Sequence, residues 1–172
     1  MGLLDRVPPL GADAFRALMR RLAATVTVVT VPGSPPVGFT ATSFTSVSLR
    51  PPLVSFCLDR GSSSWPTVER AAYVGVHLLA DGQHEVARTF ATSGIDRFAV
   101  HGAWRLGPYG VPLLDSPAAW LLCRVTRRVP AGDHAIVLAE PLQGQHDRGG
   151  APLVYHMGGY SAVGPPSQRS AA

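Results

Sequence analysis

Small hydroxyl side chains gather in one stretch of this chain, residues 38–66. They form two groups: Thr40, Thr42, Ser43, Thr45, Ser46 and Ser48, then Ser62, Ser63 and Ser64. Hydroxyls and free backbone N–H groups can hold a phosphate without a lysine, and a helix beginning after the second group would add its N-terminal amides. Threonine is also a common strand residue and serine a common helix cap. Local physics therefore weighs an anion site and plain structure about evenly.

Three further positions carry side chains suited to binding. The turn "GDH" at 132–134 places His134 at the start of a strand, where a histidine can donate to an amide or a phosphate. Arg97 and Phe98 could pair with an anion and stack on a ring. The competing interpretations are a solvated turn histidine and a surface arginine over a core phenylalanine. His77, inside an apolar run, is expected to be a buried histidine with its hydrogen bonds satisfied.

Composition excludes several chemistries. All 15 basic residues are arginine, so neither a Schiff-base lysine nor a phosphate-binding P-loop lysine is available. The arginines are scattered, which argues against nucleic-acid binding despite a net charge of +4. Cys57 and Cys123 each lie in an apolar run, and no CxxC or HExxH spacing occurs. The cysteines are therefore expected to be buried thiols, and no metal site is expected.

The length of 172 residues, with 46% hydrophobic residues and a mean hydropathy of +0.16, indicates one globular domain. We expect a flexible arm over 1–10, the domain over 11–163 and a flexible tail over 164–172. No apolar run reaches the roughly 18 residues that a membrane span needs. Asp5 and two nearby prolines interrupt the apolar core that a signal peptide requires. The sequence thus predicts a cytoplasmic protein without a membrane segment.

The elements expected around these residues are mostly strands. A helix is predicted from Asp13, with Phe15, Leu18, Met19 and Leu22 on one face, and two more at 66–70 and 81–94. Strands are predicted at 24–31, 38–44 with a continuation over 47–49, 53–58, 73–79, 118–129, 135–142 and 152–160. Residues 95–114 are expected to be mostly loop. The pattern indicates an antiparallel barrel or sandwich, and no GxGxxG follows a strand.

Six motifs in order resemble the flavin reductase-like family, the small reductase components of two-component flavin-dependent monooxygenases. They are "FRALMRRLAATVTVVT", "PVGFTATSFTSVSLRPPLVSFCL", "SSSWP", "FATSGIDRF", "GDH" and "PLVYHMGGY", and they cover roughly Phe15 to Tyr160. The chain departs from many relatives in carrying Ala24 where a glycine often stands, and in its short C-terminal tail. Neither departure touches the expected site.

The resemblance implies a mainly β fold, a Greek-key, FMN-binding split β-barrel with a few peripheral helices, assembled as a homodimer. It implies that Val37, Gly38, Phe39, Thr40, Thr42 and Ser43 line the flavin ring and ribityl chain, with Ser55, Phe56 and Cys57 beneath the ring. Ser62, Ser63 and Ser64, with Trp65 nearby, would hold the phosphate, and Arg97 and Phe98 would complete that end. His134 and Tyr160 would flank the nicotinamide nucleotide, with His134 orienting it and no residue acting as acid or base.

The implied activity is that of an NAD(P)H:flavin oxidoreductase. Hydride passes from NADH or NADPH to FMN or FAD, and the reduced flavin leaves for a partner monooxygenase. The motifs are compatible with either flavin and either nicotinamide. The alternatives are a flavin-binding accessory or carrier protein without reductase activity, and a related split barrel acting on haem or deazaflavin.

Overall fold

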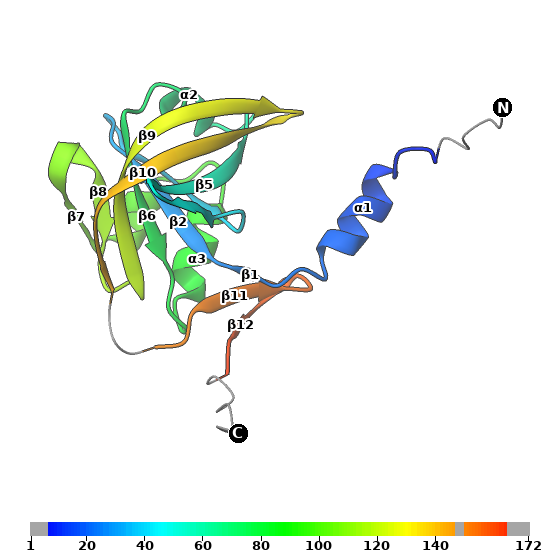
Figure 1. The fold of residues 1–172 in the computed structure, drawn as a ribbon. Helices are drawn as coiled ribbons and strands as arrows, with labels where there is room; N and C mark the ends of the chain where they lie inside the picture. The colour runs from blue at the N-terminus through cyan, green and yellow to red at the C-terminus, as the bar shows by residue number, and fades with distance from the viewer. Residues whose placement is uncertain (1–6, 147–149, 165–172) are drawn as a thin grey trace, which may run out of the picture.

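The computed structural model describes residues 7–146 and 150–164, and the described part is mainly antiparallel β-structure (Figure 1). A seven-stranded sheet has the order β3-β2-β6-β9-β10-β5-β4. Its strands are β2 (Thr27–Val31), β3 (Val37–Ala41), β4 (Thr45–Leu49), β5 (Pro52–Asp59), β6 (Tyr73–Leu78), β9 (Ala119–Ala131) and β10 (His134–His146). β3 contacts β5, although the two are not paired, so the sheet curls into a barrel that stays open at a seam. The predicted split-barrel class is confirmed.

Two smaller sheets and a few helices surround this barrel. One sheet has the order β1-β11-β12 and the other is the hairpin β7-β8. The bounds are β1 (Ala24–Thr25), β7 (Trp104–Leu106), β8 (Pro112–Leu114), β11 (Leu153–His156) and β12 (Gly159–Ala162). The helices are α1 (Ala12–Met19), α2 (Trp65–Val68), α3 (His84–Ala91), α4 (Arg97–His101) and the 3₁₀ turn η1 (Pro108–Gly110). None of the helices described is long and apolar enough to cross a membrane.

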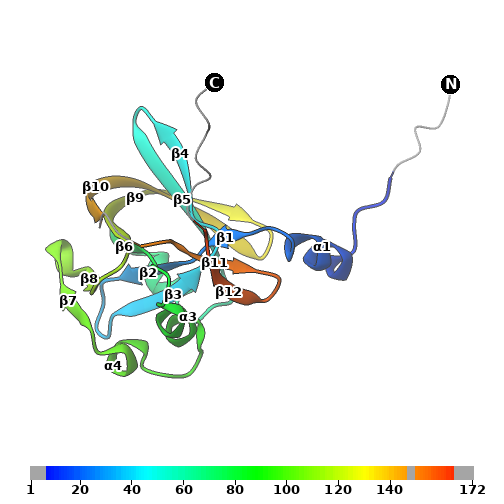
Figure 2. The same ribbon diagram turned by 90° about the horizontal axis from the view of Figure 1, so that it is seen from below.

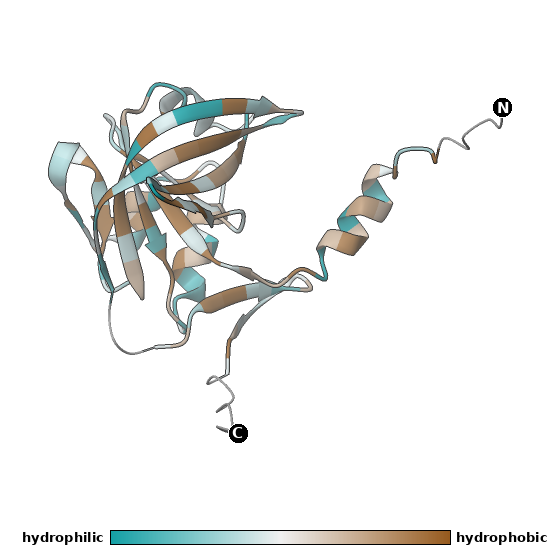
Figure 3. Cartoon of the chain, viewed as in Figure 1, coloured by the Kyte–Doolittle hydropathy of each residue, from teal (hydrophilic) through white to brown (hydrophobic). Residues whose placement is uncertain are grey.

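Strand β2 is buried on both faces because it separates two hydrophobic clusters. Its sequence, TVVTV, is β-branched throughout, which favours extended backbone. Val29 and Val31 point into the barrel core with Phe56, whereas Val28 faces a second cluster that includes Phe90 of α3. Figure 2 shows α3 beside β2 and β3, and Figure 3 shows the hydrophobic residues along these strands. This packing fixes α3 against the strand that carries Thr40.

The predicted strand 24–31 is interrupted at Val26, where the chain passes from the small sheet to the large one. Three backbone hydrogen bonds meet there. The Val26 N–H donates to the Leu153 carbonyl at 2.9 Å, the Leu79 N–H to the Val26 carbonyl at 3.0 Å, and the Leu153 N–H to the Leu79 carbonyl at 2.9 Å. We refer to these bonds as the backbone triangle. They join β2, β6 and β11 at one point.

The strand predicted over 38–44 and continued over 47–49 is also divided. β3 ends at Ala41, and β3 and β4 lie at opposite edges of the large sheet. Ser43 crosses between them: its hydroxyl accepts from the Cys57 N–H at 2.9 Å and donates to the Cys57 carbonyl at 3.3 Å. A side chain thus bonds backbone groups of β5 at the seam, and the first group of hydroxyls is spread over β3, β4 and the segment between them.

Residues 95–114, predicted as loop, contain α4, η1, β7 and β8. The Asp96 carboxylate caps α4 by accepting from the Ala99 N–H at 3.0 Å, and Gly102, with φ of 70°, ends the helix. These elements are too short to show a period in the sequence. The single strand predicted over 152–160 is likewise a hairpin, β11–β12, turning at Met157 and Gly158, both with positive φ.

The predicted helices are present but differ in their bounds. α1 begins after Gly11 and not at Asp13, and α3 begins after Gln83, whose side chain accepts from the Ala80 N–H at 2.8 Å. α1 projects away from the barrel and has no buried residue (Figure 1). The expected arm, 1–10, lies outside the described residues over 1–6, and the expected tail, 164–172, lies outside them from 165 onward.

Candidate functional site

A hollow of about 420 Å³ opens at the barrel seam, and we call it the seam hollow. It is lined by Phe39, Thr40, Ala41, Thr42, Ser43, Cys57, Leu58, Asp59, Ser62, Phe90, Ala91, Ser93, Arg97 and His134. A neighbouring outer hollow of about 380 Å³ is lined by Pro35, Pro36, Val37, Gly38, Ser63, Ser64, Gly94, Ile95, Asp96, Arg97 and Phe98. Arg97 is the residue common to both hollows.

Two hydroxyls of the first group hold the walls of the seam hollow. Thr40 donates to the Ala87 carbonyl at 2.6 Å, which ties β3 to α3. Ser43 bonds both backbone groups of Cys57, as described above. Thr42, which lies between them, is exposed and lines the hollow. Some hydroxyls of the first group are therefore structural, as Thr40 and Ser43 are, whereas Thr42 is available to a ligand in the hollow.

Arg97 is held rigidly between the two hollows. Its Nε donates to the Thr92 carbonyl at 2.7 Å, and its Nη1 donates to the Gly38 carbonyl at 2.6 Å and to the Ser64 hydroxyl at 3.4 Å. Burial lowers the pKa of its guanidinium from the usual value. Of the ion pairs among the described residues, none involves Arg97. A half-buried cation bonded to neutral oxygens is suited to receive an anion.

Ser62, Ser63 and Ser64 lie beside this guanidinium. The Ser62 hydroxyl accepts from the Ser64 N–H at 3.2 Å. Ser64 occupies the N-cap position of α2 without a side-chain cap bond, and α2 is only 4 residues long. A helix this short contributes little dipole, so the hydroxyls and Arg97 supply the anion-binding chemistry here.

His134 is the first residue of β10 and pairs with Asp59 across the ladder. Its Nδ1 lies 2.6 Å from the Asp133 carboxylate, and this hydrogen bond, with the charge of the imidazolium, lowers the pKa of Asp133. A carboxylate on Nδ1 favours the tautomer in which Nδ1 carries the proton. Nε2 is then the ring nitrogen that can serve a ligand in the seam hollow.

The structure gathers most of the predicted site residues around these two hollows. The seam hollow contains Phe39, Thr40, Thr42, Ser43, Cys57, Ser62, Arg97 and His134. The outer hollow contains Val37, Gly38, Ser63, Ser64 and Phe98, together with Arg97. Residues from five separate stretches of sequence thus meet at one place.

Four predicted residues line neither hollow. Phe56 is fully buried in the barrel core, Ser55 is 9% exposed beside it, and Trp65 packs against the same core. Tyr160 lies on β12 and lines a separate hollow with Arg88, whose guanidinium carbon is 6.0 Å from the ring centroid. In this single chain these four residues support the walls or lie apart from the seam.

Several lining residues escaped the sequence argument. Phe90, Ala91 and Ser93 come from α3 and the segment after it, and Ile95 comes from the turn before α4. Their signal was the stretch "FATSGIDRF", from which only the last two residues were selected. The turn between β2 and β3 also contributes Pro35 and Pro36.

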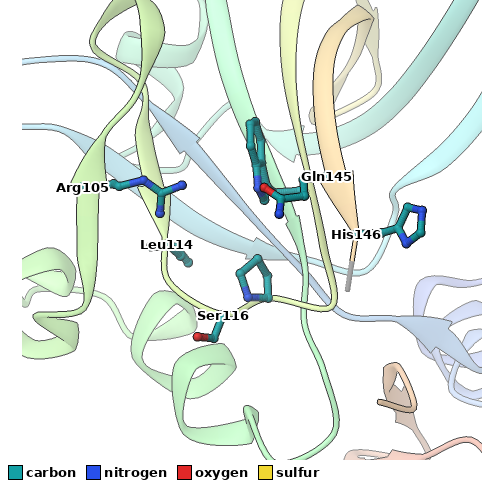
Figure 4. Close-up of a pocket in the computed structure, with 7 residues that line it drawn as sticks. Arg105, Leu114, Ser116, Gln145 and His146 are labelled. Carbon is teal, nitrogen blue, oxygen red and sulfur yellow. The ribbon is translucent and has the colours of Figure 1, made fainter. Parts of the chain in front are cut away.

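A further hollow of about 360 Å³ lies apart from both, between the β7–β8 hairpin and the ends of β9 and β10 (Figure 4). It is lined by Arg105, Leu114, Ser116, Pro117, Trp120, Gln145 and His146, none of which was predicted to bind. Arg105 is paired with Asp115 at 3.2 Å, unlike Arg97. This hollow therefore offers controls for experiments on the seam.

Comparisons with known proteins show the family of the chain. Residues 19–164 match the flavin reductase like domain. The NADH:FMN oxidoreductase of Rhodococcus erythropolis is 43% identical over 154 residues, covering 87% of this chain and 80% of that protein. The stachydrine N-demethylase reductase subunit of Rhizobium meliloti is 37% identical over 158 residues, covering 88% and 68%.

A solved structure shows the same fold. The NADH:FAD oxidoreductase of Streptomyces globisporus C-1027, in complex with NAD and FAD fragments, superposes with a TM-score of 0.88 at 33% identity. The match covers 95% of this chain and 99% of that one. The family match extends from the end of α1 to the end of the described residues, so the chain belongs to the flavin reductase like domain family.

Proposed function

We propose that this protein is an NAD(P)H:flavin oxidoreductase that supplies reduced flavin to a partner monooxygenase. The observation that carries the proposal is Arg97, a half-buried cation with no acidic partner among the described residues, at one end of a hydroxyl-lined hollow. A flavin nucleotide has a ring at one end and a phosphate at the other. The seam hollow and its Arg97 end match that polarity.

The residues present fit such a nucleotide. Arg97, Ser62 and Ser64 would bind the phosphate, and Thr42 with the backbone of β3 would contact the ribityl chain and ring. The flavin supplies the hydride-accepting chemistry when it is bound. The chain's own task is to hold two flat rings in contact and exclude water, which requires no acid or base.

His134 would orient the nicotinamide. Asp133 fixes the imidazole through Nδ1, which leaves Nε2 to meet the carboxamide of the nicotinamide or a nucleotide phosphate. His134 lines the seam hollow and pairs with Asp59 at the end of β5, three residues before Ser62. We propose that it serves the second nucleotide, because its Nε2 is not engaged by Asp133.

The direct test is an assay of NADH or NADPH oxidation at 340 nm with FMN, FAD and riboflavin. We expect flavin-dependent oxidation of at least one nicotinamide. A protein that binds flavin but oxidises neither nicotinamide would be the carrier alternative, and the proposed activity would be wrong. Reduced nicotinamides are made in the cytoplasm, and we propose that location for the enzyme.

The proposal of a partner monooxygenase rests on relatives named as reductase subunits of such systems. Reduced flavin is small and diffusible, so the two proteins need not form a stable complex. Adding a flavin-dependent monooxygenase that lacks its own reductase should give hydroxylated product with this enzyme, NADH and flavin. A control reaction with a known flavin reductase should also give product. If the control gives product and this enzyme gives none, the proposed partnership is wrong.

The homodimer is also part of the proposal, and α1 supports it. Phe15, Leu18 and Met19 form one apolar face of α1 and are 55%, 56% and 47% exposed, and Leu22, just after the helix, is 64% exposed. An apolar face of this kind on a projecting helix is unfavourable in water and suits a protein contact. A second copy of the chain presents the same face, and the edge strand β4 exposes two further apolar side chains, Val47 and Leu49.

Light scattering on a gel-filtration column tests this assembly. We expect a mass of two chains, and we expect Leu18→Glu to shift the protein toward one chain. Arg21→Glu, a charge change on the same exposed segment but off the apolar face, should leave the dimer intact. A wild-type protein of one-chain mass at micromolar concentration would overturn the homodimer.

A further inference from the structure

Gly38 on β3 leaves room for two aromatic rings that approach it from the helices. It is not one of the glycines with a positive φ, so its backbone conformation does not demand glycine. A Cβ added there would lie 2.6 Å from Cε1 of Phe90 and 3.1 Å from Cζ of Phe98. Both distances are shorter than ordinary van der Waals contact between carbons. The position therefore requires glycine for space and not for conformation.

The ring of Phe90, near the end of α3, is the surface on which α4 rests. It is fully buried and meets the ring of Phe98 edge to face, with 5.2 Å between centroids, and the ring of His101 at 5.7 Å. Both of these partners belong to α4, which begins at Arg97. Edge-to-face pairs of this kind hold the two helices in a defined relation. Because the ring is fully buried, Phe90 affects the seam hollow mainly through what it holds in place.

The hydrogen bonds of Arg97 lead back to the same two elements. Its Nη1 donates to the Gly38 carbonyl at 2.6 Å, and its Nε donates to the carbonyl of Thr92, just after α3, at 2.7 Å. The guanidinium is therefore held between the glycine and the end of the helix that carries Phe90. A shift of α4 relative to β3 would lengthen or bend these bonds and turn the charge away from its present direction.

We propose that Gly38 and Phe90 are positioning residues for the phosphate of the flavin nucleotide and that they act through Arg97. The absent side chain at position 38 lets the two rings close against β3, and this contact determines where α4 places the guanidinium. The inference rests on the proposed function, because it takes Arg97 as the residue that meets the phosphate. It extends that function by assigning the alignment of the charge to a packing contact behind it.

The first test compares FMN with riboflavin, which has the same ring and ribityl chain but no phosphate. Each is titrated into the purified, flavin-free enzyme, and the quenching of flavin fluorescence gives the Kd. We expect Gly38→Ala to raise the Kd for FMN about tenfold and that for riboflavin less than about twofold, because a misplaced cation affects only the ligand that carries the anion. Equal changes in the two Kd values, or no change in either, would overturn the inference.

The second test asks whether the effect passes through Arg97. Arg97→Gln removes the guanidinium, so its alignment no longer matters. Adding Gly38→Ala to Arg97→Gln should therefore leave the Kd for FMN within about twofold of the value for Arg97→Gln alone. If the two effects multiplied instead, position 38 would act on the flavin by another route and the inference would be wrong.

A third variant, Phe90→Leu, tests the ring without crowding β3. We expect the Kd for FMN to rise about fivefold and that for riboflavin to change less than about twofold, because α4 loses its aromatic support. Combining Phe90→Leu with Gly38→Ala should give no multiplied loss, since the ring that the new Cβ meets most closely is absent. A multiplied loss would show that the two positions act independently.

Gly75 on β6 provides the matched control. A Cβ added there would lie 2.5 Å from the Thr30 hydroxyl and 3.1 Å from Cε1 of His77, and Gly75 lines neither the seam hollow nor the outer hollow. Gly75→Ala should lower the urea midpoint, as Gly38→Ala does, and leave both Kd values within about twofold of wild type. A selective loss of FMN binding in Gly75→Ala as well would indicate a general effect of poor packing and contradict the assignment.

The outcomes separate this inference from the proposed function. If the wild-type enzyme oxidises NADH with FMN but Gly38→Ala weakens FMN and riboflavin alike, the inference falls and the reductase activity stands. If the wild-type protein binds both flavins and oxidises neither nicotinamide, the activity falls, and the Kd values still decide whether Gly38 and Phe90 position Arg97. A wild-type protein that binds no flavin would overturn both.

Discussion

Two groups of polar side chains lie only a few strands apart and differ in how their hydrogen bonds are used. In the interior, His77 is fully buried, its Nδ1 3.1 Å from the Val28 carbonyl and its Nε2 accepting from the Leu114 N–H at 3.1 Å. Thr30 is equally buried and donates to the Pro112 carbonyl at 2.6 Å. At the seam, Arg97 and His134 are partly exposed beside a hollow.

The difference separates structural from binding residues. Both ring nitrogens of His77 are bonded within the chain, the Thr30 hydroxyl proton is donated to it, and both side chains are fully buried, so neither can meet a ligand. At the seam, Arg97 is anchored by neutral carbonyls and keeps its charge unmatched among the described residues. Polar residue types alone cannot separate the two groups. Burial and the partner of each polar atom do, and substitutions on the two sides should therefore give opposite patterns of stability and binding.

The largest effect is expected from His77→Ala. It leaves the Leu114 N–H without the ring nitrogen that it bonds, removes the side-chain contact with the Val28 carbonyl and opens a cavity, at a cost of about 3 kcal/mol in the free energy of unfolding. Urea denaturation measures this loss. Flavin affinity of the folded variant should stay within twofold of wild type. A large loss of affinity without a loss of stability would place His77 in the binding group.

The next effect is a pH dependence of stability that arises from the same residue. Burial, the largest cause, lowers the pKa of His77 to about 4 from its usual 6.5. Above pH 6.5 the histidine is neutral in both states and costs nothing. As the pH falls from 6.5 toward 4, the unfolded chain binds the proton and the folded protein does not. Stability should then fall by about 1.4 kcal/mol per pH unit. Urea midpoints of wild type and His77→Leu across this range measure the difference, and parallel curves would contradict it.

Arg97→Gln should show the reverse pattern. Removing a charged donor to phosphate costs about 1.5–3 kcal/mol, so the Kd for flavin should rise roughly tenfold to a hundredfold. Stability should change by about 1 kcal/mol, because the lost bonds are to carbonyls at a partly exposed position. Arg105→Gln, in the separate hollow of Figure 4, is the control and should leave the Kd unchanged. If both substitutions raised the Kd for flavin equally, Arg97 would not be a specific binding residue.

The smallest effect is expected from His134→Ala. It should raise the KM for NADH several-fold, change the Kd for flavin less than twofold and leave stability nearly unchanged, since His134 bonds an exposed carboxylate. Steady-state kinetics with each substrate varied separately give these values. His146→Ala, another exposed histidine on β10, is the control. A change confined to flavin binding would reassign His134 to the first nucleotide.

Much of the fold could be predicted because β-branched segments such as 27–31 and alternating ones such as β9 carry their own signal. The predicted strand boundaries were wrong where contacts between distant residues determine where a strand ends. Ser43 ends a strand by bonding Cys57, and Val26 changes sheets through Leu153 and Leu79. Neither partner is visible from local sequence.

The candidate site shows the same limit. The motifs brought out Arg97 and His134, but no local rule indicates that Arg97 would be bonded to carbonyls and not to a carboxylate. Ile95 and Pro36 could not be selected, because apolar residues in turns carry no chemical signal of their own. Phe56 and Tyr160 were predicted from the resemblance to the family, and in this chain they line neither the seam hollow nor the outer hollow.

The backbone triangle at Val26 has a consequence for the order in which the protein folds. A ribosome releases the N-terminal segment first, yet Val26 and the short strand β1 find their partners on β11, near the C-terminal end of the described chain. Strand β1 therefore cannot pair until almost the whole domain has been synthesised. The barrel can begin to assemble through the β2–β3 hairpin, but its junction with the small sheet closes last. Premature termination ahead of Leu153 would leave the Val26 N–H and the Leu79 carbonyl unpaired at the edge of the core.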